Sequence, residues 1–150
     1  MRTRLSLKPS PGKSPSDRSF FLKLSSPMGI KFFLLVAAGG SCGSVLRALV
    51  GILMKPFLPW PTLVVNLGGA FLIGLFVKFS ENSANADSFR AFWIVGLCGG
   101  FTTFSAFGMD MVNFIKTGHW TNGIIYLSLN FFGTLLAIYL GFRAFSLISP

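Results

Sequence analysis

Four long apolar segments, separated by short polar stretches, dominate the chain from residue 30 onward. They cover about residues 30–54, 60–79, 89–115 and 123–145. Each is close to the roughly 20 residues that an α-helix needs to cross the hydrocarbon core of a bilayer. The pattern therefore predicts an all-α integral membrane protein with four transmembrane helices that run alternately up and down. Its connections are too short to hold a separate catalytic domain, so we do not expect an enzyme.

The residues between the segments support these boundaries. Lys55 and Pro56 end the first segment, and a polar loop at residues 81–88 separates the second from the third. Tryptophans favour the interface between membrane and water. All three lie near segment ends in this chain, at Trp60, Trp93 and Trp120.

The first 28 residues have a different character. They are rich in Ser, Pro, Lys and Arg and have no hydrophobic periodicity, which is typical of a disordered tail. A signal peptide fits poorly, because the apolar stretch that follows is too long and lacks a clear cleavage site. Met28 opens a sequence that could stand alone. We therefore predict a basic tail or an over-extended start at residues 1–28, and a four-helix transmembrane domain at residues 29–150.

The net charge of +9 does not indicate a nucleic-acid partner once the basic residues are located. Over half of the 13 Lys and Arg residues cluster at the N-terminus: Arg2, Arg4, Lys8, Lys13, Arg18, Lys23 and Lys31. A nucleic-acid binder carries such residues on a folded polar surface. With 11% charged residues, against about 25% in an ordinary soluble domain, this chain offers no such surface. We interpret the N-terminus as a cytoplasmic tail beside anionic lipid.

Outside the tail, the basic residues are nearly balanced between the two sides of the membrane. One side holds Lys31, Lys78, Arg90 and Arg143, and the other holds Lys55 and Lys116. Because this positive-inside bias is weak, we expect that the chain can insert either way up, with the basic tail favouring a cytoplasmic N-terminus.

The third segment contains the most informative motif, GLCGGFTTFSAF at residues 96–107. Its glycines weaken a helix by about 1 kcal/mol each relative to Ala, and its hydroxyl residues can bend one. A break at residues 99–102 would free backbone carbonyls, which is tolerated at membrane depth only where protein or an ion satisfies them. Converging carbonyls suit a hard monovalent cation. A flexible, close-packed helix is the alternative interpretation.

Two polar side chains lie within the first and second segments. Arg47 near a helix centre costs about 2.5–3.5 kcal/mol, which indicates a function unless the side chain snorkels to the interface. Asn66 must find a partner in the membrane. It could join two helices or offer its two N–H groups to an anion.

Aromatic and polar stripes mark the third and fourth segments. Phe104 and Phe107 are three residues apart and share one helical face. They could contact lipid or core, or their positive ring edges could line a path for a small anion. In the fourth segment Tyr126, Asn130 and Thr134 form a polar stripe, which fits either a polar track or a helix–helix interface.

Taken with their order and spacing, four motifs resemble those of the Fluc, or CrcB-type, fluoride channels. They are GGSCGSVLR (residues 39–47), PTLVVNLGGAFLIG (61–74), GLCGGFTTFSAF (96–107) and LNFFGT (129–134). The resemblance spans about residues 28–146. It implies an antiparallel, dual-topology homodimer with two pores in the inner (plasma) membrane. Such a channel exports cytoplasmic fluoride by passive electrodiffusion and confers fluoride resistance.

The resemblance also implies roles for particular residues. Gly99 and Thr102 would give backbone carbonyls to a structural sodium ion at the dimer centre, and Arg47 would lie near the vestibule. The ion pathway would comprise Asn66, Phe104, Ser105, Phe107, Tyr126, Asn130 and Thr134. Ala106 stands where many members have Thr, so we expect Ser105 to supply the missing hydroxyl.

Two other functions remain as alternatives. A small multidrug-type transporter also has four short helices, but its proton coupling needs a mid-membrane carboxylate. Asp110 is the only candidate, and it lies toward the end of the third segment. A non-transporting scaffold subunit would leave the broken helix unexplained. Since four helices are too few to enclose a pore, we expect a functional unit of eight helices from two chains.

Overall fold

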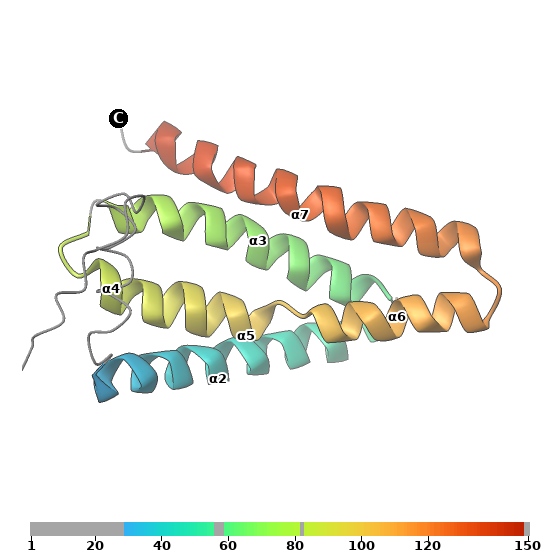
Figure 1. Ribbon diagram of the computed structural model, residues 1–150, viewed down its shortest axis with the longest axis horizontal. Coiled ribbons are helices and arrows are strands. Elements are labelled where there is room, and N and C mark those ends of the chain that lie inside the picture. The colour runs from blue at the N-terminus through green and yellow to red at the C-terminus, as the bar shows by residue number, and fades with distance from the viewer. Residues whose placement is uncertain (1–28, 56–58, 82, 149–150) are drawn as a thin grey trace, which may run out of the picture.

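The computed structural model describes residues 29–55, 59–81 and 83–148, and this part of the chain is helical throughout its regular structure (Figure 1). The elements are α2 (Ile30–Leu53), α3 (Trp60–Glu81), α4 (Ala86–Phe89), the π-helix η2 (Arg90–Cys98), α5 (Gly99–Phe101), α6 (Phe104–Lys116) and α7 (Trp120–Ile148). Four stretches are long and apolar enough to cross a membrane: Ile30–Leu53, Trp60–Glu81, Ala86–Lys116 and Trp120–Leu147. The four predicted spans are confirmed, whereas the predicted tail at residues 1–28 lies outside the described residues.

Short polar features end the second and third spans. The second continues to Glu81, whose carboxylate forms a 2.6 Å ion pair with Lys78 one turn earlier. The third ends at Lys116 and is followed by Gly118, which has a φ of 72°. This left-handed conformation strains every residue with a side chain. It lets α7 begin at Trp120, three residues before the predicted start at residue 123.

Glycines bring the helix backbones into direct contact in two pairs. In the pair of α3 and α7, a Cβ atom on Gly74 would lie 2.2 Å from the carbonyl oxygen of Ile138. In the pair of α2 and η2, a Cβ atom on Gly39 would lie 2.2 Å from the carbonyl oxygen of Phe92, and Gly43 is equally crowded. Lipid provides no hydrophobic force between helices, so such close contact is a main source of their association.

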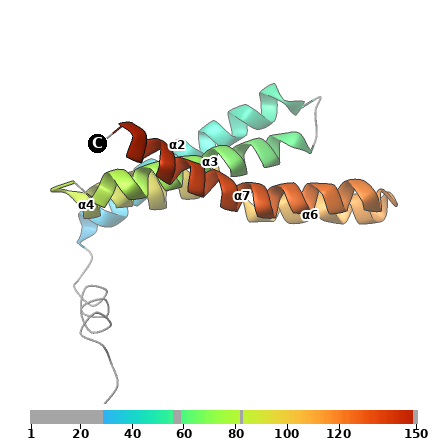
Figure 2. The same cartoon turned by 90° about the horizontal axis from the view of Figure 1, so that it is seen from above.

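Beyond these contacts, the two halves of the bundle separate at one end. Figure 2 shows α6 and α7 running together away from the end of α2 and the start of α3. Only a few large side chains are buried in the described chain, and they surround the junction of α3, α6 and α7: Leu63, Phe107 and Tyr126. The core therefore sits beside the middle of the third span.

The third span is broken at Thr102 and Thr103. Thr102 has φ −77° and ψ 158°, and Thr103 has φ −152° and ψ 122°, both extended conformations. A break was predicted at residues 99–102, but Gly99–Phe101 remain helical, so the prediction is correct for Thr102 only. The glycine at 100 serves helix packing instead, because a Cβ atom there would lie 2.5 Å from the carbonyl oxygen of Gly40. The π-helix that precedes the break was not predicted.

Candidate functional site

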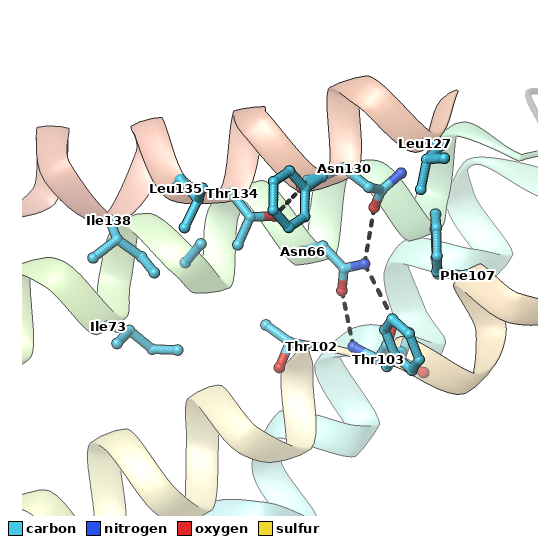
Figure 3. Close-up of a pocket in the computed structure, with 13 residues that line it drawn as sticks. Asn66, Ile73, Thr102, Thr103, Phe107, Leu127, Asn130, Thr134, Leu135 and Ile138 are labelled. Atoms are coloured by element: carbon cyan, nitrogen blue, oxygen red, sulfur yellow. Dashed lines mark hydrogen bonds between the residues drawn. The ribbon is translucent and has the colours of Figure 1, made fainter. Parts of the chain in front are cut away.

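A cavity with a volume of about 680 Å³ opens beside the break, between α3, α6 and α7 (Figure 3). Its lining is mostly apolar, with polar groups gathered around the break. The lining residues are Asn66, Ala70, Ile73, Thr102, Thr103, Phe104, Phe107, Leu127, Asn130, Phe131, Thr134, Leu135 and Ile138. Five of the residues expected in the ion pathway are among them.

Asn66 of α3 pairs with the backbone of the break. Its Oδ1 accepts the N–H of Thr103 at 2.9 Å, and its Nδ2 donates to the carbonyl oxygen of Thr103 at 3.2 Å. Nδ2 also donates to Oδ1 of Asn130 at 3.1 Å. In Figure 3 the Asn66 amide lies between the break on one side and α7 on the other. Asn66 thus joins three helical elements.

Of the three residues in the polar stripe predicted on the fourth helix, two line the cavity and one does not. Asn130 is buried, donates from Nδ2 to the carbonyl oxygen of Tyr126 at 3.0 Å, and lines the cavity together with Thr134. Tyr126 is buried too, but it is not among the lining residues. Its hydroxyl donates to Oδ2 of Asp110 at 2.7 Å. A stripe of i, i+4 positions marks one helix face, yet a long side chain such as Tyr can turn its polar end elsewhere.

The two phenylalanines after the break stack in a row. The ring centroids of Phe104 and Phe107 are 5.5 Å apart with an interplanar angle of 35°. Phe107 in turn stacks on Tyr126, at 5.6 Å and 22°. Phe104 is 83% exposed in the single chain, whereas Phe107 is 9% exposed. The row therefore runs from the protein core to its surface along the cavity.

Hydroxyl groups cap the start of α6. Thr103 Oγ1 accepts the N–H of Ala106 at 3.2 Å, as an N-cap residue does. The same oxygen lies 3.2 Å from Oγ of Ser105, and either atom can be the donor. Ser105 is exposed and does not line the cavity. Thr103 was not singled out from the sequence, although Thr is a preferred N-cap residue and Thr103 directly precedes α6.

Backbone carbonyls at the break have the chemistry expected of a sodium site. Thr103 donates its N–H to Asn66 and not to Gly99, so the Gly99 carbonyl loses its helical partner. The Thr102 carbonyl accepts from Nη1 of Arg47 at 3.4 Å. A carbonyl oxygen has two lone pairs, so this contact leaves one available. Carbonyl oxygens are suitable ligands for a hard monovalent cation. Within the described ranges, no three His, Cys, Asp or Glu side chains form a metal cluster.

Comparison with known proteins points to one family. The sequence model of the CrcB-like protein, Camphor Resistance (CrcB), family matches residues 34–142. A fluoride-specific ion channel FluC of Rhizobium meliloti is 42% identical over 113 residues, which cover 72% of this chain and 90% of that protein. A fluoride-specific ion channel FluC of Thermus thermophilus is 39% identical over 120 residues, which cover 77% and 94%. A fluoride-specific ion channel FluC 1 of Nitrobacter hamburgensis is 50% identical over 92 residues, or 58% and 73%.

Proposed function

The chain belongs to the CrcB family, and from this membership we propose that it is a fluoride channel of the inner membrane. It is a multi-pass membrane protein and not an enzyme. Fluoride crosses it by passive electrodiffusion, and the outcome is export of cytoplasmic fluoride and resistance to it.

The cavity beside the break is the observation that carries this proposal. Phe104 and Phe107 both line it, and the edge of an aromatic ring is the positive part of its quadrupole. Thr103 lines the cavity too, and its hydroxyl shares a hydrogen bond with Ser105, so the Thr103 O–H is available to an anion when Ser105 is the donor. A small anion that sheds water can exchange it for these contacts. These contacts suit a small anion better than a larger halide.

The functional unit that we propose is an antiparallel homodimer with two pores. The cavity is open on one side of the single chain, and Phe104 stands 83% exposed at its edge. A second copy would cover this face. The near balance of Lys and Arg outside the tail supports insertion in both orientations.

A sodium ion at the centre of this dimer would be held by the carbonyls of Gly99 and Thr102 from each chain. When bound, it supplies positive charge between the two paths and is not itself transported. The chain's own contribution is to free the Gly99 carbonyl by diverting the N–H of Thr103 to Asn66. Arg47 adds a second positive charge beside Thr102.

Proton-coupled transport receives less support. Its carboxylate would be Asp110, which accepts a hydrogen bond from Tyr126 and is not among the residues that line the cavity. A carboxylate that carries protons with a substrate would need to reach the substrate path.

Efflux from liposomes tests the function directly. We expect purified protein to release fluoride rapidly from loaded liposomes without a proton gradient, and to release no chloride. Equal chloride and fluoride efflux would refute the proposal. Rescue of a fluoride-sensitive bacterial strain by the chain would separate a channel from a scaffold subunit.

A further inference from the structure

The side chain of Asn66 pairs with both backbone polar groups of Thr103, its N–H and its carbonyl oxygen. In an unbroken helix its N–H would bond to the Gly99 carbonyl, but the extended backbone at Thr102 prevents this. Both polar atoms of Thr103 bond instead to the carboxamide of Asn66, at 2.9 Å and 3.2 Å. A carboxamide has the same donor and acceptor as a peptide group. Asn66 therefore replaces, within the membrane, the backbone partners that the break removes.

Both N–H donors of Asn66 are used in these contacts. Its nitrogen has two N–H groups, one bonded to the Thr103 carbonyl and the other to Oδ1 of Asn130. The N–H of Thr103 needs an acceptor, so the oxygen of the Asn66 carboxamide must face Thr103. Asn66 consequently has no N–H left to offer to an anion.

The Asn66 carboxamide is held in place by its partner on α7 and by the close approach of its own helix, α3, to the break. Asn130 is 7% exposed, and its own Nδ2 is anchored to the Tyr126 carbonyl at 3.0 Å. On α3, Gly69 allows the helix to approach the break. A Cβ atom there would lie 2.3 Å from Cγ2 of Thr102. A side chain so closely fixed is suited to determining backbone conformation.

We propose that Asn66 is a positioning residue, whose carboxamide keeps the third span broken at Thr102–Thr103 and so directs Phe104 and Phe107 into the cavity. This role replaces the direct donation to fluoride that the family resemblance implies. The consequence for ion flow rests on the proposed function, while the pairing of Asn66 with Thr103 does not.

Amide hydrogen exchange at Thr103 tests the pairing without any transport measurement. The full chain is labelled with ¹⁵N, held in detergent micelles without fluoride, and compared as wild type, Asn66→Asp and Asn66→Leu. Asp keeps an oxygen that can accept the Thr103 N–H, whereas Leu keeps neither donor nor acceptor. We expect exchange at Thr103 to be about tenfold faster in Asn66→Leu, equivalent to about 1.4 kcal/mol, and closer to wild type in Asn66→Asp.

The control is Asn113→Leu, which makes the same change at an exposed position of α6. It should leave exchange at Thr103 unaltered. Amides of α2 and the C-terminal half of α7 should exchange as in wild type in every variant, since a general increase would indicate unfolding and would count against a local role. Equal protection of Thr103 in all variants would overturn the proposal.

Fluoride efflux from liposomes supplies the second arm. Both Asn66 variants should lose flux, and Asn66→Leu should lose more. Loss of flux with unchanged exchange at Thr103 would show that Asn66 acts on the anion itself, and would refute the positioning role. If the wild type releases no fluoride, the proposed function fails, while the exchange measurement still decides how the break is held.

Discussion

Replacing Phe104 by Ile should change the rate of fluoride efflux without much change in the stability of the single chain. The ring is central to the proposed path but lies largely outside the core of its own chain. Complete burial of a Phe side chain is worth about 1.5–3 kcal/mol. Since Phe104 is 83% exposed in the single chain, it has few contacts within that chain to lose, and its replacement should change the stability of the single folded chain by about 0.5 kcal/mol or less. The ring of Phe107, 9% exposed and stacked on Tyr126, offers no such separation.

The expected effect on flux is much larger. Aromatic contacts contribute up to about 1.5 kcal/mol beyond the area they bury, and about 1.4 kcal/mol changes a rate tenfold. Because Ile has no quadrupole, the loss of one ring-edge contact in the proposed path should slow fluoride efflux by about tenfold or more. The apolar character of the site is retained.

The assay is fluoride efflux from liposomes, read with a fluoride electrode and paired with thermal unfolding of the same samples. Phe132→Ile is the matched control, because Phe132 is 66% exposed on α7 and does not line the cavity. It should conduct as wild type does. Wild-type flux in Phe104→Ile, with an unchanged melting temperature, would refute the idea that ring edges carry the anion.

Three further outcomes follow from contacts described above. Tyr126→Phe leaves Oδ2 of Asp110 without its donor and should destabilise the protein by about 1–3 kcal/mol in thermal unfolding; the exposed Tyr139→Phe should not, and equal effects would contradict this account. Gly74→Val places carbon against the backbone of Ile138, so α3 and α7 must separate, at a cost of about 1–3 kcal/mol; an unchanged melting temperature would show that the contact is dispensable. Replacing sodium by a large organic cation should lower the melting temperature by mass action, and indifference to sodium would remove the proposed ion.

The spans and the break differ in how well the sequence predicts them. Hydropathy and length depend only on neighbouring residues, so the four spans were predicted with ends that moved by a few residues. The glycines around Gly99 correctly indicated a weak third helix. They did not locate the break, because its position depends on Asn66, which is 37 positions away from Thr103 in sequence and on another helix. No local pattern contains that information.

The same distinction applies to the site. Phe104, Phe107, Asn130 and Thr134 line the cavity, and each lies on a predictable helix face. Their role in an ion pathway stays a prediction. Tyr126 turns its hydroxyl toward Asp110, a residue that the sequence suggested only for a rival function. Which of two neighbouring polar groups a long side chain reaches depends on the tertiary structure, and the spacing of residues along a helix does not reveal it.

A break that depends on another helix has a consequence for biogenesis. While the third span is alone in the bilayer, a continuous helix satisfies its peptide groups best, so we expect it to enter the membrane unbroken. Asn66 is synthesised before this span and Asn130 after it. The break can therefore form when the span meets α3, but its support from α7 arrives only with the last helix. The path across this protein is then completed at the end of membrane insertion, and a truncated chain has none.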